Sequence, residues 1–368
     1  MKRSVLMFLA GFSLAACAEQ PETTSPIPPP QFGVKPGNLT ITMTNLGTLP
    51  GAPSSEALDI NESGVIVGSS GGMGVRWQGG SMIPLPQLPG ATSCRAEFIN
   101  NAGVIAGKCA TSIGFRTFMW INSALIDIMP TASVPTALSE TGFLVGFVPG
   151  GSAFRFDGVQ LDVVPGDRAD GVNSLGEVVG SAGTQGFFWD GVTLTLIPTL
   201  GGFLASATDV NDAHQVVGGS LTAQGASDAF LWDALVGGVP KSLGPGGARF
   251  INEAGQVAGA TNCAKSSCVF VWQGKIMKSL GNIGGPVFVH GLGEDGTIVG
   301  TGGINVDGDE HAFVSYNNGL IDLDIAGSPP TGSLSSEARA SNTTGSVVGS
   351  ARIGGGASRA VLWTVIKK

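Results

Sequence analysis

The sequence predicts an all-β protein, an eight-bladed β-propeller closed by its own N-terminal strand. Three observations lead to this fold. A turn motif recurs eight times along the chain, an aromatic motif follows each copy, and a strand-like segment before the first copy matches one that the last copy lacks. Each repeat has room for four short strands, which is the content of one propeller blade.

The turn motif has the form Asn-x-x-Gly followed by an apolar stretch that ends in Gly. Asn occupies its first position in six copies, and Gly its fourth position in seven. This combination favours a type I turn, in which Asn can bond its own backbone. We therefore expect these Asn to cap turns between the first and second strands. The copies are NESGVIVG (61–68), NNAGVIAG (100–107), SETGFLVG (139–146), NSLGEVVG (173–180), NDAHQVVG (211–218), NEAGQVAG (252–259), GEDGTIVG (293–300) and NTTGSVVG (342–349).

The aromatic motif marks the third strand of each repeat. Six copies end in Trp, and these are all the Trp residues of the chain: Trp77, Trp120, Trp189, Trp232, Trp272 and Trp363. Because the row recurs in phase with the turns, we expect it in the blade core rather than on a carbohydrate-binding platform. An apolar run such as 124–128 or 192–197 follows as the fourth strand.

The last repeat stops after its third strand, at 360–366. Residues 39–47, LTITMTNLG, end in Leu-Gly like the fourth strand KIMKSLG (275–281). We expect residues 39–46 to complete blade eight, which removes an otherwise unpaired sheet edge. The propeller then occupies residues 39–368.

The N-terminus reads as an export signal. Lys2 and Arg3 precede an apolar run, residues 5–16, that is too short to cross a bilayer. The junction Leu-Ala-Ala-Cys17 resembles a bacterial lipobox, which implies a signal peptide over 1–16 and a lipid on Cys17 as the link to the membrane. Residues 17–38 are rich in Pro and read as an extended tether. The residue after Cys17 is Ala rather than Asp, which resembles the pattern of lipoproteins that are sorted to the outer membrane. We therefore expect an envelope lipoprotein of the outer membrane that faces the periplasm or the cell exterior.

The repeats resemble the bacterial extracellular repeat family named for its His-Ala-Phe motif. The motif stands intact at 311–313 and in altered form at 228–230 as Asp-Ala-Phe. The segments LGTLPG (46–51), ALDIN (57–61) and ATDVN (207–211) fit as well. The resemblance covers about residues 39–366 and implies secretion and a propeller-like fold. It brings no catalytic residues with it.

Composition narrows the possible functions. The chain is 42% hydrophobic with only 19 Lys and Arg against 27 Asp and Glu, so it is neither disordered nor a plausible nucleic-acid binder. It contains no P-loop, nucleophile elbow, HExxH or dinucleotide fingerprint. Only three His and one Tyr are present, a poor supply for acid–base catalysis. We predict no catalytic residue.

Four Cys remain after Cys17 and suggest two disulfides in an exported protein. The turn of repeat two places Cys94 opposite Cys109 across a hairpin. Cys263 and Cys268 lie in one loop, where we expect a disulfide that closes a short segment. Zinc is the rival interpretation, but two isolated pairs without nearby His make a weak ligand set.

One residue per repeat should reach the central channel, six positions before the fourth turn residue. Three of them, Arg249, His290 and Arg339, form a basic sector that could hold a carboxylate or sulfate. The alternative is that they are solvated rim residues paired with Glu97, Asp170 or Glu337. The occupants are Leu58, Glu97, Thr136, Asp170, Thr208, Arg249, His290 and Arg339.

Loop lengths point to the same face. The loops between second and third strands should vary from about five residues (69–73) to about eleven (301–311), and those between blades vary too. Variation on one face of a uniform scaffold marks a binding side. In the long loop, Asn305, Asp307 and Asp309 offer oxygen ligands at alternate positions, as part of a calcium-binding loop would. The alternative is a solvated acidic loop. No other cofactor is expected.

Two functions remain open at this point. The first is a membrane-anchored extracytoplasmic binding or scaffold propeller, with an envelope protein or glycan as partner. The second is a carbohydrate-active enzyme such as a lyase on an acidic polysaccharide. There Arg249 and Arg339 would neutralise the uronate, with His290 or Tyr316 as base.

Overall fold

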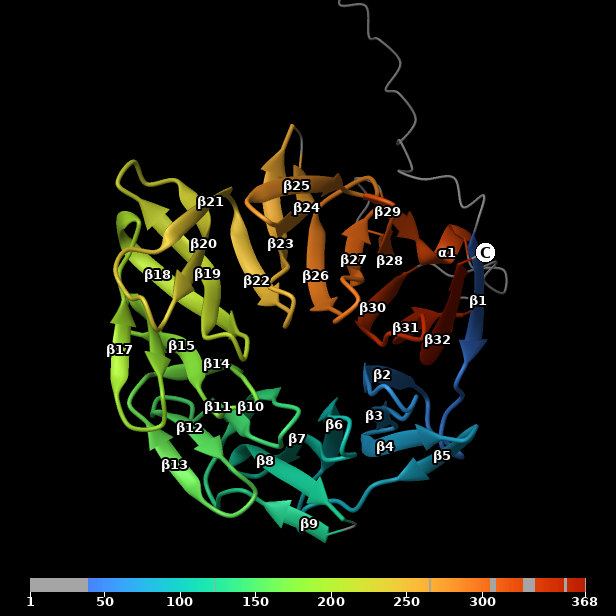
Figure 1. The fold of residues 1–368 in the computed structure, drawn as a ribbon. Coiled ribbons are helices and arrows are strands. Elements are labelled where there is room, and N and C mark those ends of the chain that lie inside the picture. The colour runs from blue at the N-terminus through green and yellow to red at the C-terminus, as the bar shows by residue number, and fades with distance from the viewer. Residues whose placement is uncertain are drawn as a thin grey trace, which may run out of the picture. The chain divides into compact units, whose positions relative to one another are not determined.

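The computed structural model describes residues 39–122, 124–264, 266–304, 309–326, 335–353 and 356–367. Within them, eight antiparallel sheets of four strands stand around a central channel (Figure 1). The predicted eight-bladed β-propeller is confirmed. In every sheet the first strand of the repeat lies innermost and the fourth lies outermost.

The first four blades follow the chain in simple order. Blade one contains β2 (Ser55–Ile60), β3 (Ile66–Ser70), β4 (Met73–Gln78) and β5 (Ser81–Pro84). Blade two contains β6 (Ser93–Ile99), β7 (Ile105–Thr111), β8 (Gly114–Ile121) and β9 (Ala124–Asp127). Blade three contains β10 (Val134–Leu138), β11 (Leu144–Phe147), β12 (Ala153–Phe156) and β13 (Leu161–Val164). Blade four contains β14 (Arg168–Val172), β15 (Val178–Ala182), β16 (Gln185–Trp189) and β17 (Leu194–Ile197).

The second half repeats the pattern until the last blade. Blade five contains β18 (Gly201–Val210), β19 (Gln215–Thr222), β20 (Ser227–Asp233) and β21 (Lys241–Pro245). Blade six contains β22 (Gly247–Ile251), β23 (Val257–Cys263), β24 (Ser266–Gln273) and β25 (Ile276–Gly281). Blade seven contains β26 (Val287–Leu292), β27 (Ile298–Gly303), β28 (Glu310–Tyr316) and β29 (Gly319–Asp322), with the short helix α1 (Leu323–Ala326) after it. Blade eight contains β30 (Ser336–Ser341), β31 (Ser346–Arg352), β32 (Ser358–Lys367) and β1 (Leu39–Asn45).

The ring closes through β1, as the sequence predicts. This strand pairs with β32 along its whole length, from Leu39 opposite Lys367 to Asn45 opposite Val361. Leu39 and Ile41 are buried in one cluster with Trp363. The two ends of the folded chain therefore hold each other in one blade (Figure 1).

A glycine in each second strand sets how closely that strand approaches the innermost one. Gly107 in β7 faces Phe118 in β8, and a Cβ on Gly107 would lie 2.0 Å from the carbonyl oxygen of Arg95. The seven equivalent glycines meet an innermost-strand carbonyl at 1.9 to 2.1 Å in the same way. The last Gly of each turn motif is thus required by this close approach of two backbones.

The Trp row lies in the core. All six Trp are buried, with relative exposures of 9% or less. The residue two positions earlier in the same strand is fully covered as well, as Phe230 and Phe270 show. The prediction of a blade core rather than an exposed platform is confirmed.

Both predicted disulfides are present. Cys94 and Cys109 are directly opposite in β6 and β7, with their Cα atoms 4.0 Å apart. Cys263 and Cys268 close the hairpin between β23 and β24, with a Cα separation of 5.9 Å.

The expected variation in the loops between second and third strands is wrong in scale. These connections run from two residues, 71–72, to six, 304–309, because the strands extend further than the motifs suggest. The connections between blades vary more, from the single residue Gly246 to the segment 323–335. The face that carries both kinds of connection is still the more variable one, but the variation lies between blades.

Some predictions fall outside the described residues. These are the signal peptide (1–16), the tether with Cys17 (17–38), and Asn305 and Asp307 of the suggested calcium loop. Among the residues that are described, no helix combines the length and apolar character needed to cross a membrane.

Candidate functional site

Every innermost strand carries a β-bulge, and the extra residue lies on the channel. In β22 the pairing with β23 shifts between Ala248 and Phe250, which leaves Arg249 unpaired. The same shift occurs in all eight blades. The bulged residues are Leu58, Glu97, Thr136, Asp170, Thr208, Arg249, His290 and Arg339, the eight that the sequence places at the channel. A bulge redirects a side chain at the cost of one ladder position.

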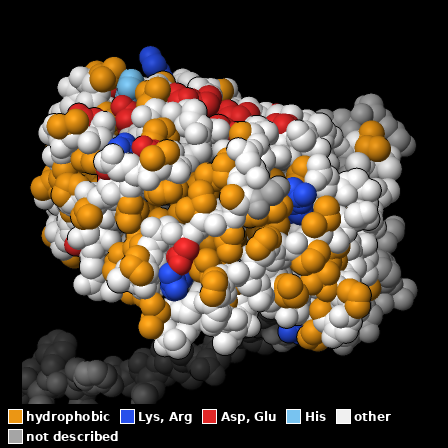
Figure 2. Space-filling view, turned by 90° about the horizontal axis from the view of Figure 1, so that it is seen from below, with side chains coloured by type: hydrophobic (Ala, Val, Ile, Leu, Met, Phe, Trp, Pro, Cys, Tyr) orange, Lys and Arg blue, Asp and Glu red, His pale blue; other side chains and the backbone are white. Residues whose placement is uncertain are grey.

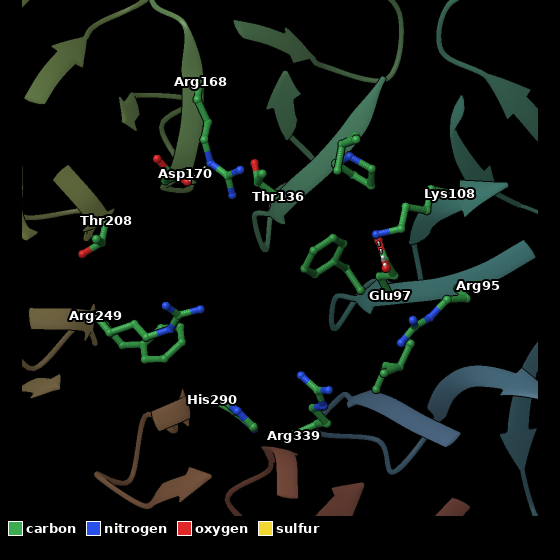
Figure 3. Close-up of a pocket in the computed structure, with 15 residues that line it drawn as sticks. Arg95, Glu97, Lys108, Thr136, Arg168, Asp170, Thr208, Arg249, His290 and Arg339 are labelled. Atoms are coloured by element: carbon green, nitrogen blue, oxygen red, sulfur yellow. Dashed lines mark hydrogen bonds and ion pairs between the residues drawn. The ribbon is translucent and has the colours of Figure 1, made fainter. Parts of the chain in front are cut away.

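These eight residues line one cavity of about 480 Å³ in the middle of the ring. Figure 3 shows that the labelled members of this group lie on separate blades around the open centre. The other lining residues come from the same strands and from β7: Arg95, Phe98, Lys108, Val134, Pro135, Arg168 and Phe250. We call the eight bulged residues the channel layer.

Most of the Lys and Arg side chains that line the cavity are paired with a carboxylate. Lys108 Nζ lies 2.9 Å from Glu97 Oε1, and Arg168 pairs with Asp170 (Figure 3). Arg95 lies 2.9 Å from Glu56. Arg339 lies 2.8 Å from Glu337 on its own strand. The expected alternative of paired rim residues therefore holds for Arg339, and its partner is the expected Glu337.

Arg249 is different. Among the described residues it forms no ion pair within 4.0 Å, and its guanidinium lies 5.6 Å from the centre of the Phe250 ring. Its side chain is exposed to the channel. The charge of Arg249 also acts on Asp170, where it opposes the effect of burial that raises the pKa of that carboxyl, but no ion pair joins the two among the described residues. The Arg249 guanidinium is therefore available to an anionic ligand in the cavity.

His290 lies between the two arginines in blade order. Its Nδ1 is 2.9 Å from the carbonyl oxygen of Ala338, so Nδ1 carries the proton and donates. Burial lowers the pKa of His290 below its usual range, and the charge of Arg339 lowers it further. The ring is therefore neutral at pH 7, and Nε2 is free to accept a hydrogen bond.

Tyr316 does not belong to this site. It lies at the end of β28 and lines two separate surface pockets with Thr297 and Ser315. The structure thus brings Arg249, His290 and Arg339 together and leaves Tyr316 outside, because the third strand of a blade does not reach the channel.

Within the described residues, no group of three or more His, Cys, Asp or Glu is placed to hold a metal ion. Of the suggested calcium ligands, Asp309 is described, and its carbonyl oxygen accepts the Ile304 N–H at 3.1 Å.

The His of the His-Ala-Phe motif has a structural setting. His311 is buried, and its Nδ1 lies 2.8 Å from Asp322 Oδ2 in the neighbouring strand. Burial alone would lower its pKa, but the hydrogen bond and charge of Asp322 raise it. The motif thus joins the third and fourth strands of blade seven.

The Asn residues of the turns do more than cap, which sequence reasoning missed. Asn100 Oδ1 accepts the Val104 N–H within its own turn, as expected of a cap. Its Nδ2 donates to the carbonyl oxygen of Ser139 in the next blade, at 3.2 Å. Such links leave all six Asn, and the one from Asn342 to Asn61 crosses the closure between blades eight and one. We call these residues the turn layer.

Acidic side chains reinforce the turn layer. The Thr343 N–H donates to Glu62, and the Asn101 N–H donates to Glu140 at 3.0 Å, each across a blade boundary. Asp212, Glu253 and Glu294 accept in the same way. Figure 2 shows acidic side chains gathered along one edge of the ring. The signal in the sequence was the recurrent acid after the turn Asn, as in Asn-Glu and Asn-Asp.

Two carboxyl groups lie between the layers. Asp59 Oδ1 accepts the Ile60 N–H, and Oδ2 accepts the Ile99 N–H of the next blade, both at 2.8 Å. Asp209 joins Val210 and Ile251 likewise. Desolvation outweighs these hydrogen bonds and raises the pKa of each carboxyl to about 7.

Comparison with known proteins identifies the class of fold. No protein-family model and no curated protein sequence matches the chain. Dipeptidyl peptidase 4 of Porphyromonas gingivalis matches with a TM-score of 0.57 at 9% identity, over 81% of this chain and 56% of that one. The β-propeller domain of the Trilobed protease from Pyrococcus furiosus matches at 14% identity over 73% of this chain and 98% of that one, with a TM-score of 0.48. The putative TolB of Agrobacterium tumefaciens matches at 13% identity over 76% of this chain and 98% of that one, with a TM-score of 0.37. At these identities the likeness concerns the β-propeller fold alone.

Proposed function

We propose that this chain is a lipid-anchored envelope protein that binds an anionic group of a partner molecule in its central channel. The observation that carries the proposal is Arg249, a guanidinium that has no carboxylate partner within 4.0 Å in the described part of the chain and that projects into a cavity of about 480 Å³. Arg339 and the free Nε2 of His290 supply further polar contacts beside it. A carboxylate matches the fork geometry of a guanidinium.

The anchor rests on the N-terminal sequence and the position of β1. The Leu-Ala-Ala-Cys17 junction resembles a lipid-attachment site, and the resemblance of the repeats to the His-Ala-Phe repeat family supports an exported protein. Leu39, the first described residue, pairs with Lys367 near the end of β32. This end of β32 lies on the same side of blade eight as the turn layer, because the Val365 N–H donates a hydrogen bond to the carbonyl oxygen of Gly345 in the turn. The opposite face carries the variable connections between blades, and we expect the partner to bind there.

A lyase that acts on an acidic polysaccharide is the second candidate. One observation favours it: His290 is neutral with Nε2 unprotonated, which is the state a general base needs. Tyr316 lies elsewhere, so it supplies neither base nor acid in the channel. Binding without turnover is therefore the better supported function.

Titration calorimetry with oligogalacturonate and with acidic peptides tests the proposal. We expect at least one class of carboxylate to bind the wild-type protein and to bind Arg249→Gln at least tenfold more weakly. The exposed Arg352, outside the channel, provides the matched control Arg352→Gln. Equal affinities of Arg249→Gln and wild type for every anion would exclude the channel as the site. New absorbance of unsaturated uronate would instead identify the lyase.

A further inference from the structure

A groove opens from the channel layer between blades six and seven. Its volume is about 360 Å³, and Thr208, Arg249 and His290 line both it and the central cavity. Its other residues are Gly247, Ala248, Ala260, Val287, Phe288 and Val289. The groove lies where β22 and β26 begin, on the face that carries the connections between blades.

The walls of the groove are apolar. Val287 and Val289 are buried, whereas the Phe288 side chain is 56% exposed. Gly247 leaves space, because a Cβ there would meet no atom within 4 Å. These apolar walls stabilise an apolar side chain of a ligand, and the polar groups of the groove, Thr208, Arg249 and His290, lie at the end that it shares with the central cavity.

Three features therefore lie side by side. Arg249 offers a charged fork, His290 Nε2 offers an acceptor, and the groove offers an apolar pocket. The last residue of a polypeptide carries the matching set on one Cα: a carboxylate, an N–H donor and a side chain. A uronate lacks the apolar group, and a fatty acid lacks the donor.

We propose that the channel layer and this groove bind the C-terminal carboxylate of a polypeptide that ends in an apolar residue. This inference rests on the proposed function and specifies its ligand. The carboxylate pairs with Arg249 and Arg339, the terminal N–H donates to His290 Nε2, and the terminal side chain enters the groove. Charge complementarity and the shared walls of the two cavities select this occupant.

Fluorescence anisotropy with labelled hexapeptides tests it. The probes share one sequence and end in Phe with a free carboxylate, in Phe with an amide, or in Ser with a free carboxylate. We expect the Phe acid to bind best, and the amide and the Ser peptide to bind at least tenfold more weakly. Trigalacturonate serves as a carboxylate without an apolar group.

Two variants separate the two halves of the site. Arg249→Gln should lower the affinity for the peptide that ends in Phe with a free carboxylate at least tenfold, and Arg352→Gln should not change it. Gly247→Leu fills the groove without backbone strain, since Gly247 has no positive φ. This variant should lower the affinity for the peptide that ends in Phe at least tenfold and leave the affinity for the peptide that ends in Ser unchanged.

The outcomes are distinguishable. Equal binding of acid and amide, or insensitivity to Gly247→Leu, overturns the inference. If trigalacturonate binds in an Arg249-dependent manner and no peptide does, the inference falls and the proposed function stands. If neither ligand class binds, both fall.

Discussion

The channel layer and the turn layer lie three residues apart on the same innermost strands, yet they behave oppositely. In the turn layer six of eight blades carry Asn, and each amide links its blade to the next. In the channel layer Leu, Glu, Thr, Asp, Arg and His occur at one structural position. A repeat retains a residue where the ring geometry requires it. The residue varies where the bulge directs a side chain into the channel, because the ring geometry does not require a particular side chain there.

The largest expected effect tests the ring on which both layers depend. A chain starting at residue 48 lacks β1 and exposes the edge of β32. Its free energy of unfolding should fall by several kcal/mol, about the loss of a core strand. A chain starting at residue 37 should match the full mature protein. Chemical denaturation measures both, and equal stabilities would contradict closure through β1.

Loss of one turn-layer amide should have the next largest effect. Asn100→Ala leaves the Val104 N–H without its acceptor and removes the Nδ2 links to the carbonyl oxygens of Ser139 and Glu140 in the next blade. We expect about 3 kcal/mol of destabilisation and unchanged anion affinity. The neighbour Asn101 provides the control for an exposed link: its Oδ1 accepts the Glu62 N–H of blade one at 2.8 Å, and Asn101→Ala should cost under about 1 kcal/mol. A weakened anion affinity in Asn100→Ala would show that the two layers are not independent.

The carboxyls between the layers should make stability depend on pH. The pKa of Asp59 is about 7 in the folded protein against an ordinary value of 3.8, so folding favours its protonated form. Stability should therefore be highest below about pH 4 and fall as pH rises toward 7, by about 1.4 kcal/mol per pH unit for each such group. Denaturation at pH 5 and pH 7 should show a smaller difference in Asp59→Ala than in wild type. The exposed Glu310→Ala is the control, and an unchanged difference in Asp59→Ala would refute the assignment.

The smallest effect on stability should come from the channel layer itself. Arg249→Gln removes an exposed side chain that forms no ion pair with any residue the structure describes, so the free energy of unfolding should change by no more than about 0.5 kcal/mol. Thermal melting checks this directly. A loss above 2 kcal/mol would mean that Arg249 is a structural residue, and the contrast between the layers would fail at this position.

Much of the fold could be predicted from the sequence because its signals are local and repeated. The turn motif sets the number of blades, and the missing fourth strand of the last repeat identifies 39–46 as its replacement. The position of Cys94 and Cys109 on either side of one turn sets their pairing. The eight channel residues followed from the same register, since strand phase alone determines which residue faces the axis.

The tertiary structure decided what depends on contacts between blades. Whether a channel cation has a carboxylate partner depends on where neighbouring side chains lie, so the lack of such a partner at Arg249 among the described residues could not be assigned from spacing. The pairing of Arg339 with Glu337, two residues away on the same strand, was among the alternatives that the sequence offered. Tyr316 was placed with them because the sequence shows residue type but not radial position. The Asn amides reach carbonyl groups about 40 residues away, which a local turn rule does not include. Local periodicity determines the architecture of this protein, whereas its electrostatics arise only when eight strands meet around one axis.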